Sequence, residues 1–211
     1  MAPVRRIINA QRVTDFLQGV LDENWSSSTI IVCGTRDSFL EQLLATVQLQ
    51  AAEHVGNPQL LTKSLGLLSR SHKIKTIFCP TLEHLRAYLS VGVQSQTSSV
   101  EGKHVSRSLL AILNPLSLHH STPEFSAQGL SRTLASAVEA SHRANMELVL
   151  CECQDPLDPA NTERGEALWY VDIPLISNAT RIGTEGNSWT GGTVPVARVV
   201  ERWFYFEHST T

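Results

Sequence analysis

The junction from Gly34 to Ser38 separates an apolar strand pattern from an amphipathic helix pattern. At this strand-turn-helix position, P-loop proteins carry G-x-x-x-x-G-K-[ST]: the backbone N–H groups and the lysine bind phosphate, and the hydroxyl binds Mg²⁺. Counting from Gly34, the second glycine falls on Phe39, the lysine on Leu40 and the hydroxyl on Glu41. Phe39 and Leu40 offer phosphate no polar group, and Glu41 repels it. The junction therefore predicts a strand-turn-helix that does not bind ATP.

The second position of a P-loop site is an acidic residue at the end of a later apolar strand, where it orders the metal ion. Here "SLLAIL" is followed by Asn114 and Pro115, and the next carboxylate is Glu124. Because both positions are changed, we predict that this chain alone does not hydrolyse ATP and is not an enzyme.

Other catalytic patterns are absent from the sequence, which has no G-x-S-x-G, H-E-x-x-H or G-x-G-x-x-G. His119 and His120 could form a nucleophile and base with Ser117 or Cys151, but a solvated loop pair is the favoured interpretation. The 4 cysteines lack zinc-finger spacing and are predicted to be buried thiols. We therefore predict no metal and no cofactor.

The composition is that of a soluble, intracellular globular protein, with 42% hydrophobic and 18% charged residues. A net charge of −3 provides no global basic field, so nucleic-acid binding would need a local patch. The apolar runs are too short to span a bilayer, and the first residues include no apolar core of signal-peptide length.

Alternating strand and helix patterns provide the scaffold for these residues. Buried strands are predicted at 29–33, 72–80, 108–114 and 146–153, with helices at 11–22, 37–51, 57–71, 81–92 and 125–143. The helix after the first strand is expected to begin at Asp37 or Ser38 and to turn one face to the core, comprising Leu40, Leu43, Leu44, Val47 and Ala51. Near-continuous apolar strands indicate a mainly parallel sheet covered on both faces. We predict a single α/β domain over residues 1–211.

Three segments depart from this alternation. Residues 93–106 are expected to form a mobile loop. Residues 154–195 are irregular apart from a short strand at "ALWYVDI", and "VPVARVVERWFYFEH" is expected to form a strand or a bent hairpin. Alternation in that last segment would place Trp203 and Tyr205 on one face, which is either buried or a partner interface.

The phrases "SHKIKTIFCPTLEHLRAYLS", "SLLAILNPLSLHH", "GLSRTLASAVEASHRANMELVLCEC" and "VARVVERWFYFE" resemble the RecA-like core of recombinase paralogues. The resemblance covers residues 28 to 207 and is closest to the small members that partner a SWIM-domain protein in Shu-type complexes. It implies a RecA-like pseudo-ATPase subunit that promotes recombinase filament assembly during homologous recombination. The implied partners are a SWIM-domain protein or another RecA-like subunit, with single-stranded or forked DNA as a candidate ligand. The implied location is the nucleus, with the cytoplasm as the alternative.

By this resemblance, segment 154–195 would face DNA, and its candidate contacts are Arg164, Arg181 and Trp189. A second, basic cluster comprises Lys63, Arg70, Lys73 and Lys75. The alternative for the first group is a surface loop with solvated arginines. The alternative for the second is solubility and protection of an edge strand.

Two other functions remain open. One is a RecA-like accessory subunit of the Elongator tRNA-modification complex, which would prefer RNA. The other is an α/β enzyme with an unrecognised site. That enzyme would need a deep polar pocket at the strand ends, near Gly34, Cys79, Asn114 and Cys151.

Overall fold

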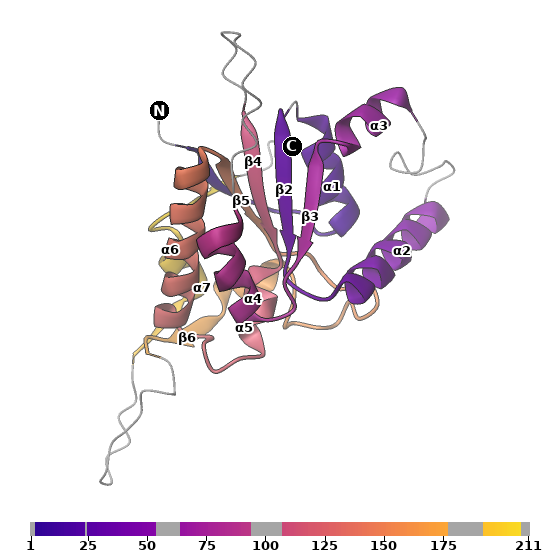
Figure 1. Ribbon diagram of the computed structural model, residues 1–211. Helices are drawn as coiled ribbons and strands as arrows, with labels where there is room; N and C mark the ends of the chain where they lie inside the picture. The colour runs from indigo at the N-terminus through magenta and orange to yellow at the C-terminus, as the bar shows by residue number, and fades with distance from the viewer. Residues whose placement is uncertain (1–2, 24, 54–63, 94–106, 177–191, 208–211) are drawn as a thin grey trace, which may run out of the picture.

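The computed structural model describes residues 3–23, 25–53, 64–93, 107–176 and 192–207 (Figure 1). Its centre is a six-stranded parallel sheet in the order β3-β2-β4-β5-β1-β8. The strands are β1 (Arg5–Ile8), β2 (Ser27–Val32), β3 (Ile74–Phe78), β4 (Ser108–Leu113), β5 (Glu147–Cys151) and β8 (Tyr205–Glu207). An antiparallel pair, β6 (Asp172–Pro174) and β7 (Thr193–Pro195), lies toward the C-terminus. The predicted fold class is confirmed.

Helices cover both faces of the sheet, as Figure 1 shows. One side carries α1 (Val13–Asp22), α2 (Arg36–Glu53) and α3 (Leu65–Ser71). The other carries α4 (Leu82–Ala87), the π-helical turn η2 (Tyr88–Gly92), α6 (Ala127–Ala144), the 3-10 turn η3 (Glu166–Tyr170) and α7 (Val196–Val200). A short helix, α5 (Pro115–His120), follows β4 directly.

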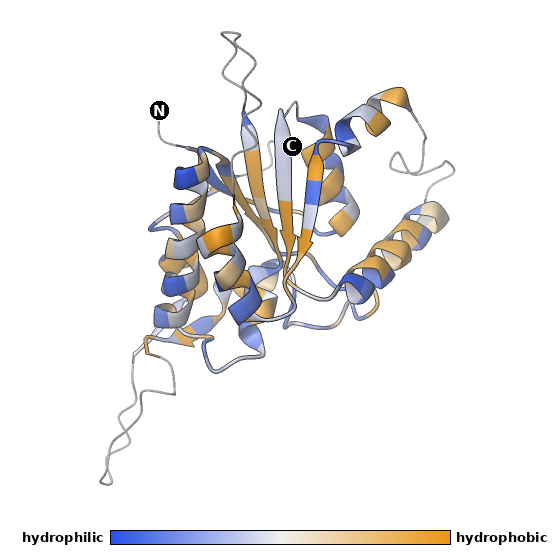
Figure 2. Ribbon diagram, viewed as in Figure 1, coloured by the Kyte–Doolittle hydropathy of each residue, from blue (hydrophilic) through white to orange (hydrophobic). Residues whose placement is uncertain are grey.

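The two covered faces explain why the strands are continuously apolar. Along β2, Ile31 packs into the core beside α6, while Ile30 packs into the core beside α1. Leu110 and Leu109 of β4 divide in the same way. Side chains of a strand alternate between faces, so a sheet buried on both sides needs apolar residues at successive positions. Figure 2 shows this as orange colouring along β4 and the carboxyl half of β2.

The strand β1 was not predicted, because two of its four residues are charged. Arg6 is accommodated by two carboxylates from distant segments. Its guanidinium lies 2.5 Å from Glu23 and 3.1 Å from Glu207. The strand is inserted between β5 and β8, a position that no local pattern indicates.

Three local predictions were wrong. The expected loop at His119 and His120 is the helix α5, which Pro115 opens at its first position. The expected strand "ALWYVDI" is η3 followed by the short β6. The expected C-terminal strand or hairpin contains α7, since the valines at 196, 199 and 200 form one buried helical face.

The inward face of α2 also differs from the prediction, apart from Leu43, which is partly buried against the core. Phe39, Gln42 and Thr46 are buried, at helical spacing. Leu40 and Leu44 are 44% and 58% exposed. Gln42 Nε2 donates to Asp155 Oδ2 at 3.2 Å. Polar residues therefore face inward, because this helix rests partly on a polar loop.

Several predicted features lie outside the described residues. These are the first part of the expected helix at 57–71, residues 94–106 of the expected loop, and part of segment 154–195. Among the helices that the structure describes, none has both the length and the apolar character needed to cross a membrane.

Candidate functional site

The carboxyl ends of β2 and β4 are the expected ligand position in this sheet. The chain passes from β2 to β3 on one side, and β4 then pairs with β2 on the other. Open parallel sheets bind ligands where the strand order reverses in this way. Gly34 and Asn114 stand at this point.

Two N–H groups of the turn after β2 are hydrogen-bonded within the protein. Gly34 N donates to Cys79 O at 2.9 Å, and Ser38 N donates to Thr35 Oγ1 at 3.2 Å. Thr35, rather than the predicted Asp37 or Ser38, therefore caps α2. Phe39 is buried, with its ring 5.8 Å from that of Phe78. Phe39 of the first turn of α2 thus serves packing, while Arg36 and Asp37 are exposed.

Asn114 joins β4 to the chain beyond β5. It adopts a left-handed conformation with φ of 59°. Its N–H donates to Cys151 O and its Oδ1 accepts from Cys153 N, both at 2.8 Å. The side chain at the end of β4 is therefore used to connect two strand ends.

Glu152 is a buried carboxyl group that the sequence analysis missed. Leu116 N donates to its Oε1, and Ser117 Oγ donates to its Oε2 at 2.7 Å. Burial raises its pKa to about 8, although both hydrogen bonds favour the charged form. Glu152 thus caps the start of α5 and fills space at the strand ends. The sequence feature that could have revealed it is its position directly after an apolar strand.

All 4 cysteines are buried and free, as predicted. Burial, with Glu152 and Cys79 nearby, raises the pKa of Cys33. Cys151 and Cys153 lie 3.7 Å apart between sulfurs. In the part of the chain that is described, no group of three or more His, Cys, Asp or Glu side chains is arranged to hold a metal ion.

His119 is buried, which corrects the expectation of a solvated histidine. Its Nε2 lies 3.0 Å from Thr133 Oγ1 and its Nδ1 lies 3.3 Å from Glu124 O. Burial lowers its pKa to about 4, with Arg86 nearby. A neutral ring with the proton on Nδ1 fits both contacts. These two ring contacts link α5 to α6 and to the segment before it, and neither of them involves Cys151.

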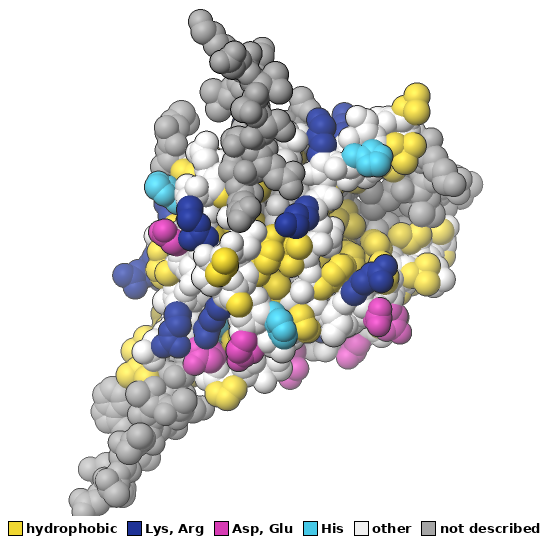
Figure 3. Space-filling model, viewed as in Figure 1, with side chains coloured by type: hydrophobic (Ala, Val, Ile, Leu, Met, Phe, Trp, Pro, Cys, Tyr) yellow, Lys and Arg dark blue, Asp and Glu magenta, His cyan; other side chains and the backbone are white. Residues whose placement is uncertain are grey.

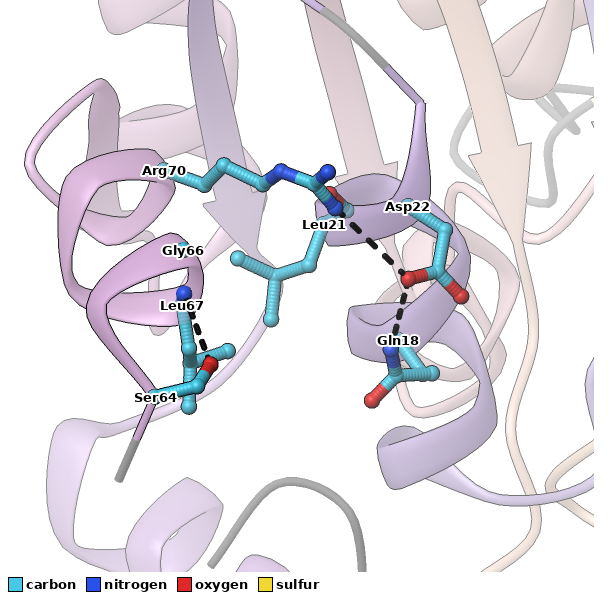
Figure 4. Close-up of a pocket in the computed structure, with 7 residues that line it drawn as sticks. All are labelled: Gln18, Leu21, Asp22, Ser64, Gly66, Leu67 and Arg70. Carbon is cyan, nitrogen blue, oxygen red and sulfur yellow. Dashed lines mark hydrogen bonds and ion pairs between the residues drawn. The ribbon is translucent and has the colours of Figure 1, made fainter. Parts of the chain in front are cut away.

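The predicted basic cluster is divided by the structure. Arg70 donates to Leu21 O at 2.9 Å and lies 3.9 Å from Asp22, so it joins α3 to α1 (Figure 4). It borders a cavity of about 340 Å³ between these helices. Lys73 and Lys75 are exposed at the β3 edge, and Lys75 Nζ lies 5.8 Å from the centre of the Tyr88 ring. Lys63 lies outside the described residues.

The candidates from the irregular segment are only partly described. Arg164 is half-buried and lies 3.8 Å from Asp155. Its charge also favours the ionised form of Glu152. Arg164 therefore belongs to the polar interior near the strand ends. Arg181 and Trp189 lie outside the described residues.

The two C-terminal aromatic candidates do not share a strand face. Trp203 lies in the turn before β8, packs against the core and carries Arg202 over its ring at 5.5 Å. Tyr205 is 54% exposed on β8, at the sheet edge opposite β3. Of these two aromatic residues, Tyr205 is therefore the one whose side chain is accessible to a partner protein.

An apolar surface on α2 is the feature that the sequence analysis assigned to the core. We define the outer stripe of α2 as Leu40, Leu44, Val47 and Ala51, of which only Val47 is half-buried. Figure 3 shows hydrophobic side chains gathered over this helix and beside β3. Large exposed apolar patches are typical of interaction surfaces, so this stripe is a candidate for one.

The fold defines the class of the protein as α/β, with a parallel sheet. At the strand ends where such sheets bind ligands, Asn114 and Glu152 are hydrogen-bonded within the protein. A family model described as SPAC22G7.03-like matches residues 6–160. The chain therefore belongs to the SPAC22G7.03-like family, and the match runs from β1 to just beyond β5. No curated protein matches this chain.

Proposed function

We propose that this chain is a non-catalytic, RecA-like subunit of a homologous-recombination DNA-repair complex. It binds a partner protein through the outer stripe of α2 and helps to assemble the recombinase filament. The observation that carries the proposal is the exposure of Leu40 and Leu44, at 44% and 58%, on one stripe of a long helix.

Burial of the outer stripe against a partner would remove its leucines from water. Burying one such side chain contributes about 1.5–3 kcal/mol relative to full exposure, and less where it is already half covered. Leu49 is 47% exposed but falls on another side of α2, so it is not part of the stripe. This gives the helix a matched position for comparison.

The strand ends support a role without catalysis. Asn114 and Glu152 are both committed to backbone hydrogen bonds at the point where a substrate would enter. Two cavities lined by described residues lie elsewhere, between α1 and α3 and between α6 and α7. These features give no support to the alternative of an enzyme with a deep polar pocket at this edge.

The test is affinity purification of the tagged protein from its native cells, followed by mass spectrometry. Three forms are compared: the natural chain, Leu44→Asp and the control Leu49→Asp. We expect a SWIM-domain protein and a recombinase with the natural chain and the control, and a loss of at least tenfold with Leu44→Asp. A charge in the centre of an apolar interface is left without its water shell.

Two results would overturn the proposal. Equal recovery with Leu44→Asp would remove the outer stripe as the interface. Recovery of Elongator subunits in place of repair proteins would move the function to tRNA modification.

A further inference from the structure

A second cavity, of about 330 Å³, lies on the other side of the sheet from α2. It is bordered by the first turns of α6, by the β6–β7 pair and by α7. Its apolar walls come from Ala127, Leu175, Val194 and Val199. Gln128 N donates to Leu175 O at 3.1 Å, which fixes the position of β6 against α6. The cavity is therefore formed by elements that are bonded to each other.

Two arginines line the cavity together with these apolar walls. Arg198 belongs to α7, and Arg202 follows four residues later. Arg198 Nη1 lies 3.6 Å from Glu201 Oε2, and the two side chains are 75% and 48% exposed. An exposed pair of this kind contributes little and exchanges easily with another carboxylate.

Arg202 lies over the ring of Trp203, with 5.5 Å from Cζ to the ring centre. A guanidinium presents its N–H groups in the plane of a rigid fork. The fork matches a carboxylate, which accepts two parallel hydrogen bonds from it. The two arginines thus suit an acidic ligand.

The walls distinguish between two kinds of acidic ligand. Binding of single-stranded nucleic acid relies on aromatic side chains against which bases stack. Among the described residues that line this cavity, the apolar ones are aliphatic and none is aromatic. An aliphatic wall with arginines instead fits a protein side chain such as Leu or Phe, with Asp or Glu beside it.

We propose that this cavity docks a segment of a partner protein in which a large apolar side chain is flanked by carboxylates. Charge complementarity selects the acidic residues, and the aliphatic walls receive the apolar one. This site is separate from the outer stripe of α2 and stands whether or not the repair function is correct.

The test uses the full chain and a phage-displayed library of random dodecapeptides. The most enriched peptide is then synthesised with a fluorescent label, and its affinity is measured by anisotropy. We expect enriched peptides to combine Asp or Glu with Leu, Phe or Trp. The variant Arg198→Glu with Arg202→Glu should weaken binding at least tenfold, and Leu175→Ser at least threefold.

The control is Lys73→Glu with Lys75→Glu, which makes the same change of charge at the β3 edge and should leave the affinity unchanged. Circular dichroism is used to check that each variant is folded. A double variant with Arg198→Gln and Arg202→Gln removes the two charges without reversing them and serves as a milder test. Three results would overturn the proposal: no enrichment of acidic and apolar peptides, binding that survives the arginine changes, or self-association lost in the same variants. Loss of oligothymidylate binding through these arginines would also overturn it, because it would assign the cavity to nucleic acid.

Discussion

At the scale of single residues, two buried titratable groups give this fold a characteristic response to pH. His119 has its pKa lowered to about 4 and Glu152 has its pKa raised to about 8, in both cases chiefly by burial. Each is held neutral near pH 7 by the interior, but their effects on stability have opposite signs.

For His119, the unfolded chain binds a proton below about pH 6.5 that the folded chain does not accept until about pH 4. Its contribution to stability is therefore complete above pH 6.5 and is lost as the pH falls toward 4. We expect His119→Gln to cost about 1–3 kcal/mol at pH 7, because buried hydrogen bonds are disturbed. The difference from the natural chain should shrink at pH 5 in urea unfolding. A constant difference would mean that the ring is not held neutral.

For Glu152, the folded chain holds a proton from pH 4.5 to about 8 that the unfolded chain has released. Its stabilising effect is complete below pH 4.5 and is lost as the pH rises toward 8. Between pH 6.5 and 8, where His119 no longer titrates, the natural chain should lose stability. Glu152→Gln should not show that loss. If urea unfolding gives the same pH dependence of stability for both chains, the carboxyl group is ionised in the folded state.

At the scale of elements, the rotation of α2 decides which side chains stabilise the fold. Phe39 to Ala should cost about 3 kcal/mol, the lower end of the range for a buried Phe. Leu44→Gln should change stability by less than about 0.5 kcal/mol, because its side chain already meets water. Thermal unfolding of the two variants measures this directly. A larger loss of stability for the Leu44 variant than for the Phe39 variant would mean that the face predicted from the sequence is the buried one.

The β3 edge supplies the exposed part of the predicted basic cluster. Lys73→Glu with Lys75→Glu should weaken the binding of a labelled oligothymidylate. If each lysine contacts one phosphate, the slope of log affinity against log salt concentration should become less steep by about 1.4. Lys73→Arg with Lys75→Arg keeps the charge and should bind as the natural chain does. Unchanged affinity at low salt would leave these lysines with a role in solubility and edge protection.

At the scale of the whole molecule, the strand order reverses at a position where open parallel sheets bind ligands, and Asn114 and Glu152 are hydrogen-bonded to backbone groups there. We therefore expect 1 mM MgATP to leave the melting temperature unchanged, since a ligand that binds only the folded state raises it. Differential scanning calorimetry with and without the nucleotide measures this. A rise of several degrees would show that the turn at Gly34 still binds phosphate.

The sequence alone determined the alternation of strands and helices, the parallel sheet and the loss of phosphate-binding residues. Each depends on residues close together in the chain, where apolar periodicity and turn chemistry act locally. The same reasoning placed β2, β4 and β5 near their observed bounds, because strands covered on both faces are apolar at nearly every position.

Only the tertiary structure decided the insertion of β1, the rotation of α2 and the burial of Glu152 and His119. Arg6 is compatible with a strand because Glu23 and Glu207 reach it from distant segments. Gln42 faces inward because Asp155 lies opposite. Leu40 and Leu44 of the same helix remain exposed. Such choices depend on which polar groups meet across the fold, and local spacing does not specify those meetings.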